Sequence, residues 1–244
     1  MKKKIEGMQE FLLASEKMPR TIDAIDVKGK FMWWTMGDWK LWCTYGMSGQ
    51  WSKNAHDKNT AVVVEVEDTN TKNSFKINFH DPRRFGTLKF VNDGSSHAKK
   101  LRSLGPDILE SASLNPEIFA KNMLKKTNRT IAEALMDQGA VSGIGNYLRA
   151  EALFSASVDP WKCVTELSAK EYESLFFSVL QTAKSSYEAQ GATIKTYRSV
   201  DGSSGTSQFF FKVYAQSSCP SGHTISRARD AGGRTIHWCS VCQT

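Results

Sequence analysis

Residues 138–151, which read QGAVSGIGNYLRAE, constrain the fold of this chain more than any other stretch. Ahead of them lies TIAEALMDQ, in which Ile131 and Leu135 recur at the spacing of an amphipathic helix. Behind them lies NYLRAEALF, in which Leu148 and Ala152 begin a second apolar stripe. Glycines between the two stripes give the backbone the freedom that a tight turn needs. We therefore predict two short helices joined by a glycine-rich turn.

The second helix is expected to begin at Asn146, a residue type that often caps helix N-termini. The first N–H groups of a helix have no partner within it and lie at the positive end of its dipole, so they can bind an anion. Because the chain carries a net charge of +7, we expect that anion to be a nucleic-acid phosphate. A glycine-rich turn before a helix is a weak indicator by itself, and many basic proteins bind no polyanion.

Length and composition limit the class of protein. With 244 residues the chain suits one large domain or two modest ones. No apolar run reaches the length of a membrane span, and no secretory signal opens the chain. The 5 cysteines are an odd number with a cluster near the C-terminus, which favours reduced thiols and a metal site over disulfides. We expect an intracellular protein of the nucleus or cytoplasm that is not secreted and binds no membrane.

Residues 1–110 are predicted to form a β-sandwich or barrel of short strands. The stretches KFMWWTM, WKLWCTYGMSGQW, AVVVEVED and SFKINF are rich in aromatic and β-branched residues, and turn residues such as Thr69 and Asn70 separate them. Ahead of them, MKKKIEGMQEFLLASEKM favours a short amphipathic helix that ends at Pro19.

After residue 110 the strand pattern gives way to helical spacing. We predict helices at roughly 116–125, 129–137, 146–154 and 168–190. The last of them opens with a capping box made by Ser168 and Glu171. These helices occupy a second segment, 111–205, and the clustered cysteines lie in a third, 206–244. The polar stretch GATIKTYRSVDGSSGTSQ is expected to be a mobile loop, either a linker or a lid over a binding site.

The stretch HDPRRFG is predicted to leave the sheet as a loop, because Pro82 cannot continue a strand ladder. Two interpretations of its side chains are open. In the first, Arg83 and Arg84 form surface salt bridges while Phe85 enters the core. In the second, the loop is a wedge whose guanidinium contacts phosphate or an orphaned base while the ring enters a base stack.

The C-terminal segment carries the residues of a metal site. Cys239 and Cys242 form a CxxC pair, and Cys219 is followed four positions later by His223. Together they offer four ligands for one tetrahedral Zn²⁺, with a β-hairpin between the two halves. No open coordination position is indicated, so the zinc would be structural; chance clustering is the alternative. His237 is a spare candidate that we expect to face solvent.

The quoted motifs together resemble the formamidopyrimidine-DNA glycosylase/endonuclease VIII family, which excises oxidised bases from DNA. DQGAVSGIGNYLRAEALF resembles its helix–two-turn–helix, DPRRFG its intercalation loop, and GMSG at 46–49 the loop with a further void-filling residue. The Cys-His-Cys-Cys finger with CPSGH is similar to an endonuclease VIII-like subgroup. The resemblance runs from about Ile22 to the end. It implies an α+β fold, with an N-terminal β-sandwich lobe and a C-terminal helical lobe that contains the helix–two-turn–helix and a β-hairpin zinc finger.

The resemblance also implies residues that bind DNA. Met47, Arg83 and Phe85 would fill the gap that a flipped-out damaged nucleotide leaves in the stack. Asn146 and Arg234 would grip the phosphates on either side of that nucleotide. Without the resemblance, Arg234 would be taken as an ordinary surface arginine on the finger.

For catalysis the resemblance implies Lys30, which would act near the lesion, and Glu151, which would support the active site. The alternatives are plain surface charge for Lys30 and, for Glu151, a helix-surface ion pair with Arg149 or Arg129. The family's nucleophile is an N-terminal proline followed by a glutamate, whereas this chain begins Met-Lys-Lys-Lys. We therefore expect some tens of N-terminal residues to be missing. The remaining candidates for the amine are the α-amino group, with a pKa of about 8, and a lysine whose pKa is lowered from about 10.4.

These observations favour a base-excision repair glycosylase with abasic-site (AP) lyase activity. It would act on oxidised bases, pyrimidines by similarity to the endonuclease VIII branch. The partner would be damaged DNA, duplex or single-stranded, bound by a monomer. The main alternative is a damaged-DNA or DNA-structure binding protein without chemistry. A third interpretation, a zinc-stabilised RNA- or ribosome-associated protein, rests on charge and the finger alone.

Overall fold

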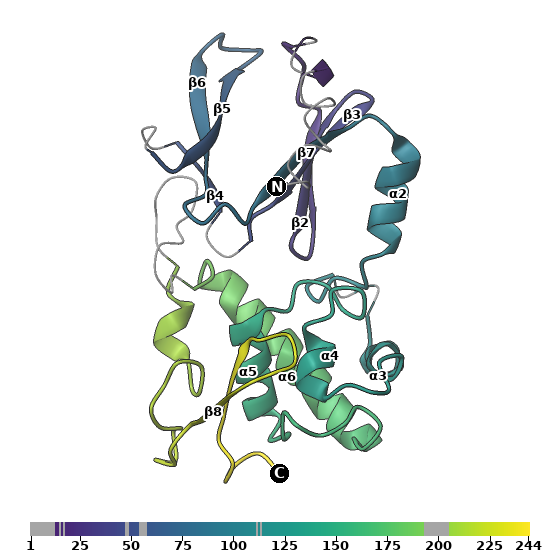
Figure 1. Cartoon of the computed structure of the whole chain (residues 1–244), viewed down its shortest axis with the longest axis vertical. Helices are drawn as coiled ribbons and strands as arrows, with labels where there is room; N and C mark the ends of the chain where they lie inside the picture. The colour runs from purple at the N-terminus through teal and green to yellow at the C-terminus, as the bar shows by residue number, and fades with distance from the viewer. Residues whose placement is uncertain are drawn as a thin grey trace. The chain divides into compact units, whose positions relative to one another are not determined.

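The computed structural model describes residues 13–14, 16, 18–46, 49–53, 58–110, 112, 114–192 and 205–244 (Figure 1). Contacts divide the chain into two compact units, Met1–Leu101 with Ala192–Gly205 and Arg102–Gly191 with Thr206–Thr244. The sequence suggested three segments, with breaks after residues 110 and 205. In the structure the helices after residue 110 and the C-terminal hairpin belong to one unit, because hydrogen bonds join them.

The first unit contains two antiparallel sheets. The larger has the strand order β1 (Ala24–Lys28), β2 (Phe31–Met36), β3 (Trp39–Thr44) and β7 (Thr87–Val91). The smaller has the order β4 (Gln50–Ser52), β6 (Ser74–His80) and β5 (Thr60–Glu67). Helix α2 (Gly94–Arg102) follows β7. Burial alternates along β3 and β5, as expected of strands with one face against a core.

Aromatic side chains join the two sheets. Trp34 of the larger sheet lies with its ring 4.8 Å from that of Trp51 in the smaller sheet, and Trp51 lies 5.1 Å from Phe79. All three are at most 4% exposed. Because residues of both sheets share one core, the predicted β-sandwich is confirmed.

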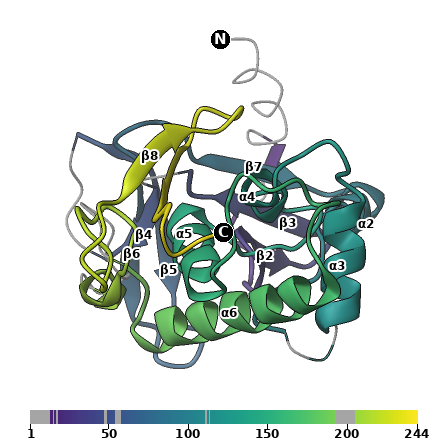
Figure 2. The same ribbon diagram turned by 90° about the horizontal axis from the view of Figure 1, so that it is seen from below.

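The second unit is mainly helical. Its elements are α3 (Pro116–Leu124), α4 (Ile131–Leu135), α5 (Asn146–Ser155), α6 (Ala169–Glu188), the 3₁₀ turn η3 (Ser207–Phe210), β8 (Ser226–Arg229) and β9 (Thr235–Trp238). All four predicted helices are present, with ends shifted by at most a few residues. The capping box of Ser168 and Glu171 is also present at the start of α6. Figure 2 shows α6 next to α5, against which it packs.

The turn between α4 and α5 is anchored in the core of this unit. Leu135 before the turn, Ile144 within it and Leu153 after it are at most 1% exposed. Leu175 and Val179 of α6 are completely buried in the same cluster. Since buried residues before, within and after the turn belong to one core, the start of α5 has a fixed position within the unit.

Two expectations fall largely outside the described residues. They are the amphipathic helix before Pro19 and the polar loop, of which residues 193–204 are not described. Among the helices that the structure does describe, none combines the length and the apolar character needed to span a membrane.

Candidate nucleic-acid interface and metal centre

The start of α5 differs from the sequence prediction in one respect. Its N-cap is Gly145, in an extended conformation and without a side-chain cap, so Asn146 is the first helical residue and not the cap. The Asn146 amide is used elsewhere. Its Nδ2 donates to the backbone oxygen of Thr235 on β9 at 2.9 Å, and its Oδ1 accepts a hydrogen bond from Arg149. Asn146 therefore joins the helix to the C-terminal hairpin.

The turn between β8 and β9 presents Arg234. Its geometry comes from Asp230, whose Oδ1 accepts the Arg234 N–H at 2.8 Å and whose own N–H donates to the Arg234 oxygen at 3.0 Å. Gly233 adopts φ +74°, a left-handed conformation that favours glycine. Arg234 is exposed and lies one residue before Thr235, the partner of Asn146. The two residues predicted to grip phosphates therefore lie in one unit, on segments joined by a hydrogen bond.

A buried ion pair supports this arrangement. Arg149 Nη1 lies 2.6 Å from Asp230 Oδ2, and the two side chains are 1% and 2% exposed. The same nitrogen donates to the backbone oxygen of Ala132 at 3.2 Å. Burial would raise the pKa of Asp230, but the Arg149 guanidinium holds it below its usual value.

Sequence reasoning missed this pair. It treated Arg149 as a possible surface partner of Glu151. The sequence held one signal, because Arg149 lies among the apolar residues Leu148, Ala150 and Ala152. In the structure residues 148–153 are all buried, and a charge there requires a partner. Nothing in the sequence identified Asp230, 81 positions away, as that partner.

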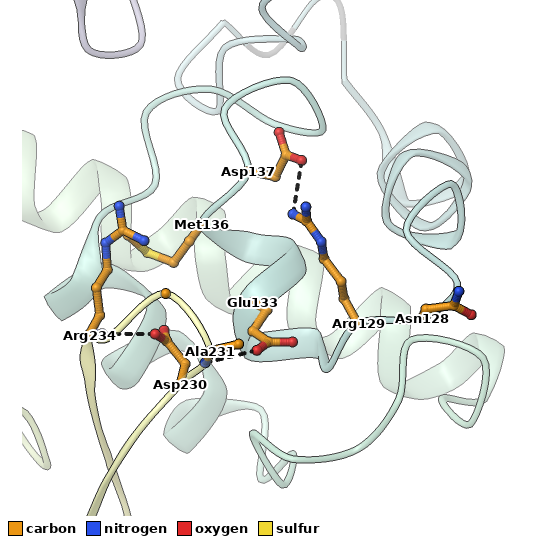
Figure 3. Close-up of a pocket in the computed structure, with 9 residues that line it drawn as sticks. Asn128, Arg129, Glu133, Met136, Asp137, Asp230, Ala231 and Arg234 are labelled. Atoms are coloured by element: carbon orange, nitrogen blue, oxygen red, sulfur yellow. Dashed lines mark hydrogen bonds and ion pairs between the residues drawn. The ribbon is translucent and has the colours of Figure 1, made fainter.

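A pocket of about 470 Å³ opens between α4 and the hairpin turn (Figure 3). Its charged lining consists of Arg129, Glu133, Asp137, Asp230 and Arg234. Most of these charges are already paired: Arg129 contacts Asp137 at 3.2 Å, and Glu133 accepts the N–H of Ala231 at 3.2 Å. The other carboxylate oxygen of Glu133 completes a capping box at the start of α4. Glu133 therefore links that helix to the hairpin turn.

Glu151 is not a surface carboxylate. It is 5% exposed, and its two oxygens accept the backbone N–H groups of Lys212, Val213 and Tyr214 at 2.8, 3.0 and 2.7 Å. The surface ion pair that we considered for Glu151 is therefore wrong. Its carboxylate instead fixes the segment that leads into the C-terminal finger.

The loop at residues 81–86, here called the wedge loop, leaves β6 as predicted. Asp81 Oδ2 accepts the N–H of Gly86 at 2.7 Å, which closes the loop. Phe85 is 59% exposed, so its predicted alternative place in the core is wrong. The Arg83 guanidinium lies 5.3 Å from the centre of the Phe85 ring. The tip of the loop thus presents a cation and an aromatic ring together.

The GMSG loop approaches the wedge loop. A Cβ added to Gly46 would lie 2.7 Å from the Cβ of Phe85, and Gly46 has φ +60°, so only glycine fits there. The two loops predicted to carry void-filling residues are therefore in contact. Met47 lies outside the described residues.

Lys30 lies in the tight turn between β1 and β2. Lys28 pairs with Phe31 across this turn, and Gly29 adopts φ +57°, the conformation that such a two-residue turn requires. The Lys30 side chain is exposed.

The predicted metal ligands come together. The ligand atoms of Cys219, His223, Cys239 and Cys242 all lie within 4.8 Å of one another. His223 Nδ1 is 3.6, 3.7 and 3.3 Å from the sulfurs of Cys219, Cys239 and Cys242, and the sulfurs of Cys219 and Cys242 are 4.0 Å apart. Tetrahedral Zn²⁺ with ordinary bond lengths needs about 3.5 Å between N and S and about 3.8 Å between two sulfurs. The donor set and its spacing fit that ion.

Neighbouring thiols shift the pKa values of the cluster in opposite directions: the pKa of Cys242 is raised to about 11, mainly by its hydrogen bond with Cys239. Burial would raise the pKa of the Cys219 thiol, but hydrogen bonds from the His223 and Ser221 backbone and from the other thiols lower it to about 7. Thiolate is the form that binds a metal. His237 is not one of the ligands and does not face solvent as expected: it is half-buried, with its ring 4.9 Å from Tyr214, a residue that Glu151 holds in place.

Comparison with known proteins is consistent with this arrangement. Residues 2–88 match the domain family described as "Formamidopyrimidine-DNA glycosylase N-terminal domain". Residues 104–198 match the domain family described as "Formamidopyrimidine-DNA glycosylase H2TH domain". The first match begins well before Ile22, where the resemblance carried by the quoted motifs starts.

Individual relatives agree with the family matches. Formamidopyrimidine-DNA glycosylase of Zymomonas mobilis is 35% identical over 81% of this chain and 72% of its own length. The enzyme of that name from Desulfitobacterium hafniense is 31% identical over 98% and 88%. These matches do not distinguish the endonuclease VIII-like subgroup.

Solved structures show the same fold. The MutM (Fpg) protein of Thermus thermophilus has a TM-score of 0.80 and 29% identity, with 92% of this chain and 83% of that one covered. Lactococcus lactis Fpg in complex with abasic-site DNA has a TM-score of 0.83 and 25% identity, with 96% and 86% covered. On the strength of both domain matches and these relatives, the chain belongs to the formamidopyrimidine-DNA glycosylase family.

Proposed function

We propose that this protein is a base-excision repair glycosylase that removes oxidised bases from duplex DNA and then cleaves the abasic strand as a lyase. Relatives named formamidopyrimidine-DNA glycosylase support the first activity, and the Lactococcus lactis relative is solved with abasic-site DNA. The protein acts as a monomer inside the cell, where its substrate is. We propose oxidised pyrimidines as the preferred substrate because the finger with CPSGH is similar to that of an endonuclease VIII-like subgroup.

The observation that carries the proposal is the hydrogen bond between Asn146 and Thr235 at 2.9 Å. It joins the start of α5 to the strand beside Arg234, so one amide and one guanidinium are offered from adjacent segments. Phosphate contacts of this kind fix the register of a protein on a duplex, whereas base contacts specify the lesion. We name Asn146, Arg234 and the Arg149–Asp230 pair behind them the phosphate clamp.

The wedge loop supplies the complementary part of the proposal. Removing a nucleotide from the stack costs a few kcal/mol, and a protein group that enters the gap offsets part of that cost. Phe85 is exposed at the loop tip with Arg83 beside it, which suits this role. Met47 is proposed as a further filler.

For the chemistry we propose attack by an amine of this chain on the sugar C1′. The N–C1′ bond forms, the glycosidic bond breaks, and the base leaves with the proton that the amine gives up. The C1′–O4′ bond of the sugar then opens as O4′ takes a proton, which leaves an iminium at C1′. Loss of a C2′ proton from the resulting iminium then eliminates the 3′ phosphate. Lys30 is proposed to act beside the sugar. Glu151 is proposed to support the site by fixing residues 212–214.

One structural Zn²⁺ is proposed in the finger, held by Cys219, His223, Cys239 and Cys242. All four positions of a tetrahedron are then filled by protein, which leaves no place for a reacting water. The ion would fix the two ends of the β8–β9 hairpin, which carries Arg234.

The test uses the full chain on duplexes that contain one oxidised pyrimidine, one oxidised purine, one abasic site or no damage. We expect base release from the damaged duplexes, fastest for the pyrimidine. We also expect a covalent adduct when borohydride is added with the abasic duplex, and mass spectrometry of the trapped peptide identifies the amine. Tight binding to damaged DNA without base release or adduct would instead support the non-catalytic DNA-binding alternative.

A further inference from the structure

Arg149 is buried between the two segments that carry the proposed phosphate contacts. We propose that it is a positioning residue for DNA binding. One arm of its guanidinium orients the Asn146 amide, and the other acts through Asp230 on the turn that presents Arg234. This inference rests on the proposed function, because it concerns how the same DNA contacts are held.

The first arm determines which end of the Asn146 amide faces which neighbour. Arg149 Nη2 donates to Asn146 Oδ1. Since a guanidinium has donors only, the amide oxygen must face it and the NH₂ group must point away. That NH₂ group donates one hydrogen bond to the backbone oxygen of Thr235. Its second N–H can donate to a phosphate oxygen. In the reversed orientation the amide oxygen would face the phosphate and repel it.

The second arm reaches the hairpin turn. Arg149 Nη1 contacts Asp230 Oδ2 at 2.6 Å, while Asp230 Oδ1 accepts the Arg234 N–H at 2.8 Å. One carboxylate therefore receives the buried guanidinium on one oxygen and shapes the turn with the other. Because both arms belong to one planar group, a shift of the turn and a rotation of the Asn146 amide are coupled.

The hairpin does not depend on Arg149 for its attachment to the helices. Glu133 of α4 binds the Ala231 N–H at 3.2 Å, and the side chain of Gln243, next to the ligand Cys242, donates to the oxygen of Val158 at 2.9 Å. A substitution that keeps the charge at position 149 should therefore disturb orientation more than folding. A loss of DNA affinity in a variant that still folds would therefore indicate a positioning role and not a merely structural one.

The test compares Arg149→Lys with Arg129→Lys, a matched change at a guanidinium that is exposed and paired with Asp137. Lysine keeps the charge next to Asp230 but cannot bridge to Asn146 as well. Binding to a duplex with a tetrahydrofuran abasic-site analogue is measured for each variant, alone and combined with Asn146→Ala. We expect Arg149→Lys to weaken binding about tenfold, and Asn146→Ala to add almost nothing in that background, because contacting residues couple strongly. Arg129→Lys should bind like the parent.

A second readout needs no DNA. The side-chain amide of Asn146 gives a pair of NMR signals whose shifts report its hydrogen bonds, and Arg149→Lys should move them toward those of a solvated asparagine. Metal content and thermal midpoint are recorded as folding checks, and Asp230→Asn replaces Arg149→Lys if the latter is unfolded. Unchanged affinity and signals in the folded variant, or losses that simply add, would overturn the inference. If Asn146→Ala and Arg234→Ala leave binding unchanged in the parent chain, the proposed DNA contacts themselves fail, and the inference with them.

Discussion

The wedge loop of the first unit and the phosphate clamp of the second are both proposed to touch DNA, yet they are built in opposite ways. The wedge loop is closed by one carboxylate, Asp81, and leaves Phe85 59% exposed. In the clamp, an ion pair with side chains 1% and 2% exposed lies behind Asn146 and Arg234. The first is an exposed tip on a short loop, and the second is an extension of the core.

The difference follows from what each part is proposed to meet. Phosphates lie at positions set by the duplex, so contacts that are ordered before binding lose little entropy on binding. A wedge residue enters a space that exists only after a base has left the stack, so it has no partner before that moment. The comparison predicts that substitutions in the clamp and its supports cost stability, whereas substitutions at the wedge tip cost function alone.

The largest effect is expected from loss of a metal ligand. Cys239 is completely buried, and Cys239→Ser should release the metal and unfold the β8–β9 hairpin. Structural zinc contributes on the order of 10 kcal/mol in small zinc domains, so DNA affinity should fall by more than about 100-fold. Metal analysis and hydrogen exchange measure this, with protection lost in β9 and kept in β2 and β3.

Cys163→Ser is the matched control, because Cys163 is half-buried and lies outside the cluster. It should keep the metal and bind DNA like the parent. A Cys239→Ser protein that retains both metal and affinity would show that the cluster does not support the clamp.

A smaller effect is expected at Glu151, which supports the segment before the finger. Glu151→Gln replaces an oxygen that accepts backbone N–H groups with an NH₂ group that cannot. Leaving a buried donor without its charged partner costs about 1–3 kcal/mol. Denaturant unfolding should show this loss, while Glu173→Gln on the exposed face of α6 should lie within about 0.5 kcal/mol of the parent. Equal stabilities for the two variants would mean that the segment is held by other contacts.

The parts of the molecule that the sequence predicted well are those with local causes. The helices and the exit of the wedge loop from β6 follow from apolar spacing and from Pro82. The clustering of Cys219, His223, Cys239 and Cys242 follows from residue type and spacing. The predicted cap at Asn146 was wrong because the extended backbone that a cap needs lies at Gly145, and only the turn geometry determines that.

The parts that were missed depend on partners far away in the chain. Arg149 meets Asp230 across 81 positions, and Glu151 meets Val213 across 62. No local pattern encodes such a pairing. The sequence could show only that a charge in a buried stretch of α5 needs a partner, and it could not say which. The position of His237 was wrongly predicted for the same reason, since the Tyr214 ring packs against it and Glu151 holds the backbone of Tyr214.

The smallest effect on stability, and the sharpest test of the comparison, is expected at Phe85. Phe85→Ala removes a ring that is 59% exposed, so the free energy of unfolding should change by no more than about 0.5 kcal/mol. If the ring fills the gap left by a flipped nucleotide, base release from duplex DNA should nevertheless slow severalfold. Release from single-stranded DNA should change little, because no stack has to be filled there. Phe177→Ala, at a ring on α6 that is 53% exposed, is the matched control and should leave both rates unchanged. A Phe85→Ala protein that is clearly destabilised, or that slows equally on both substrates, would remove the distinction between an unsupported wedge and a supported clamp.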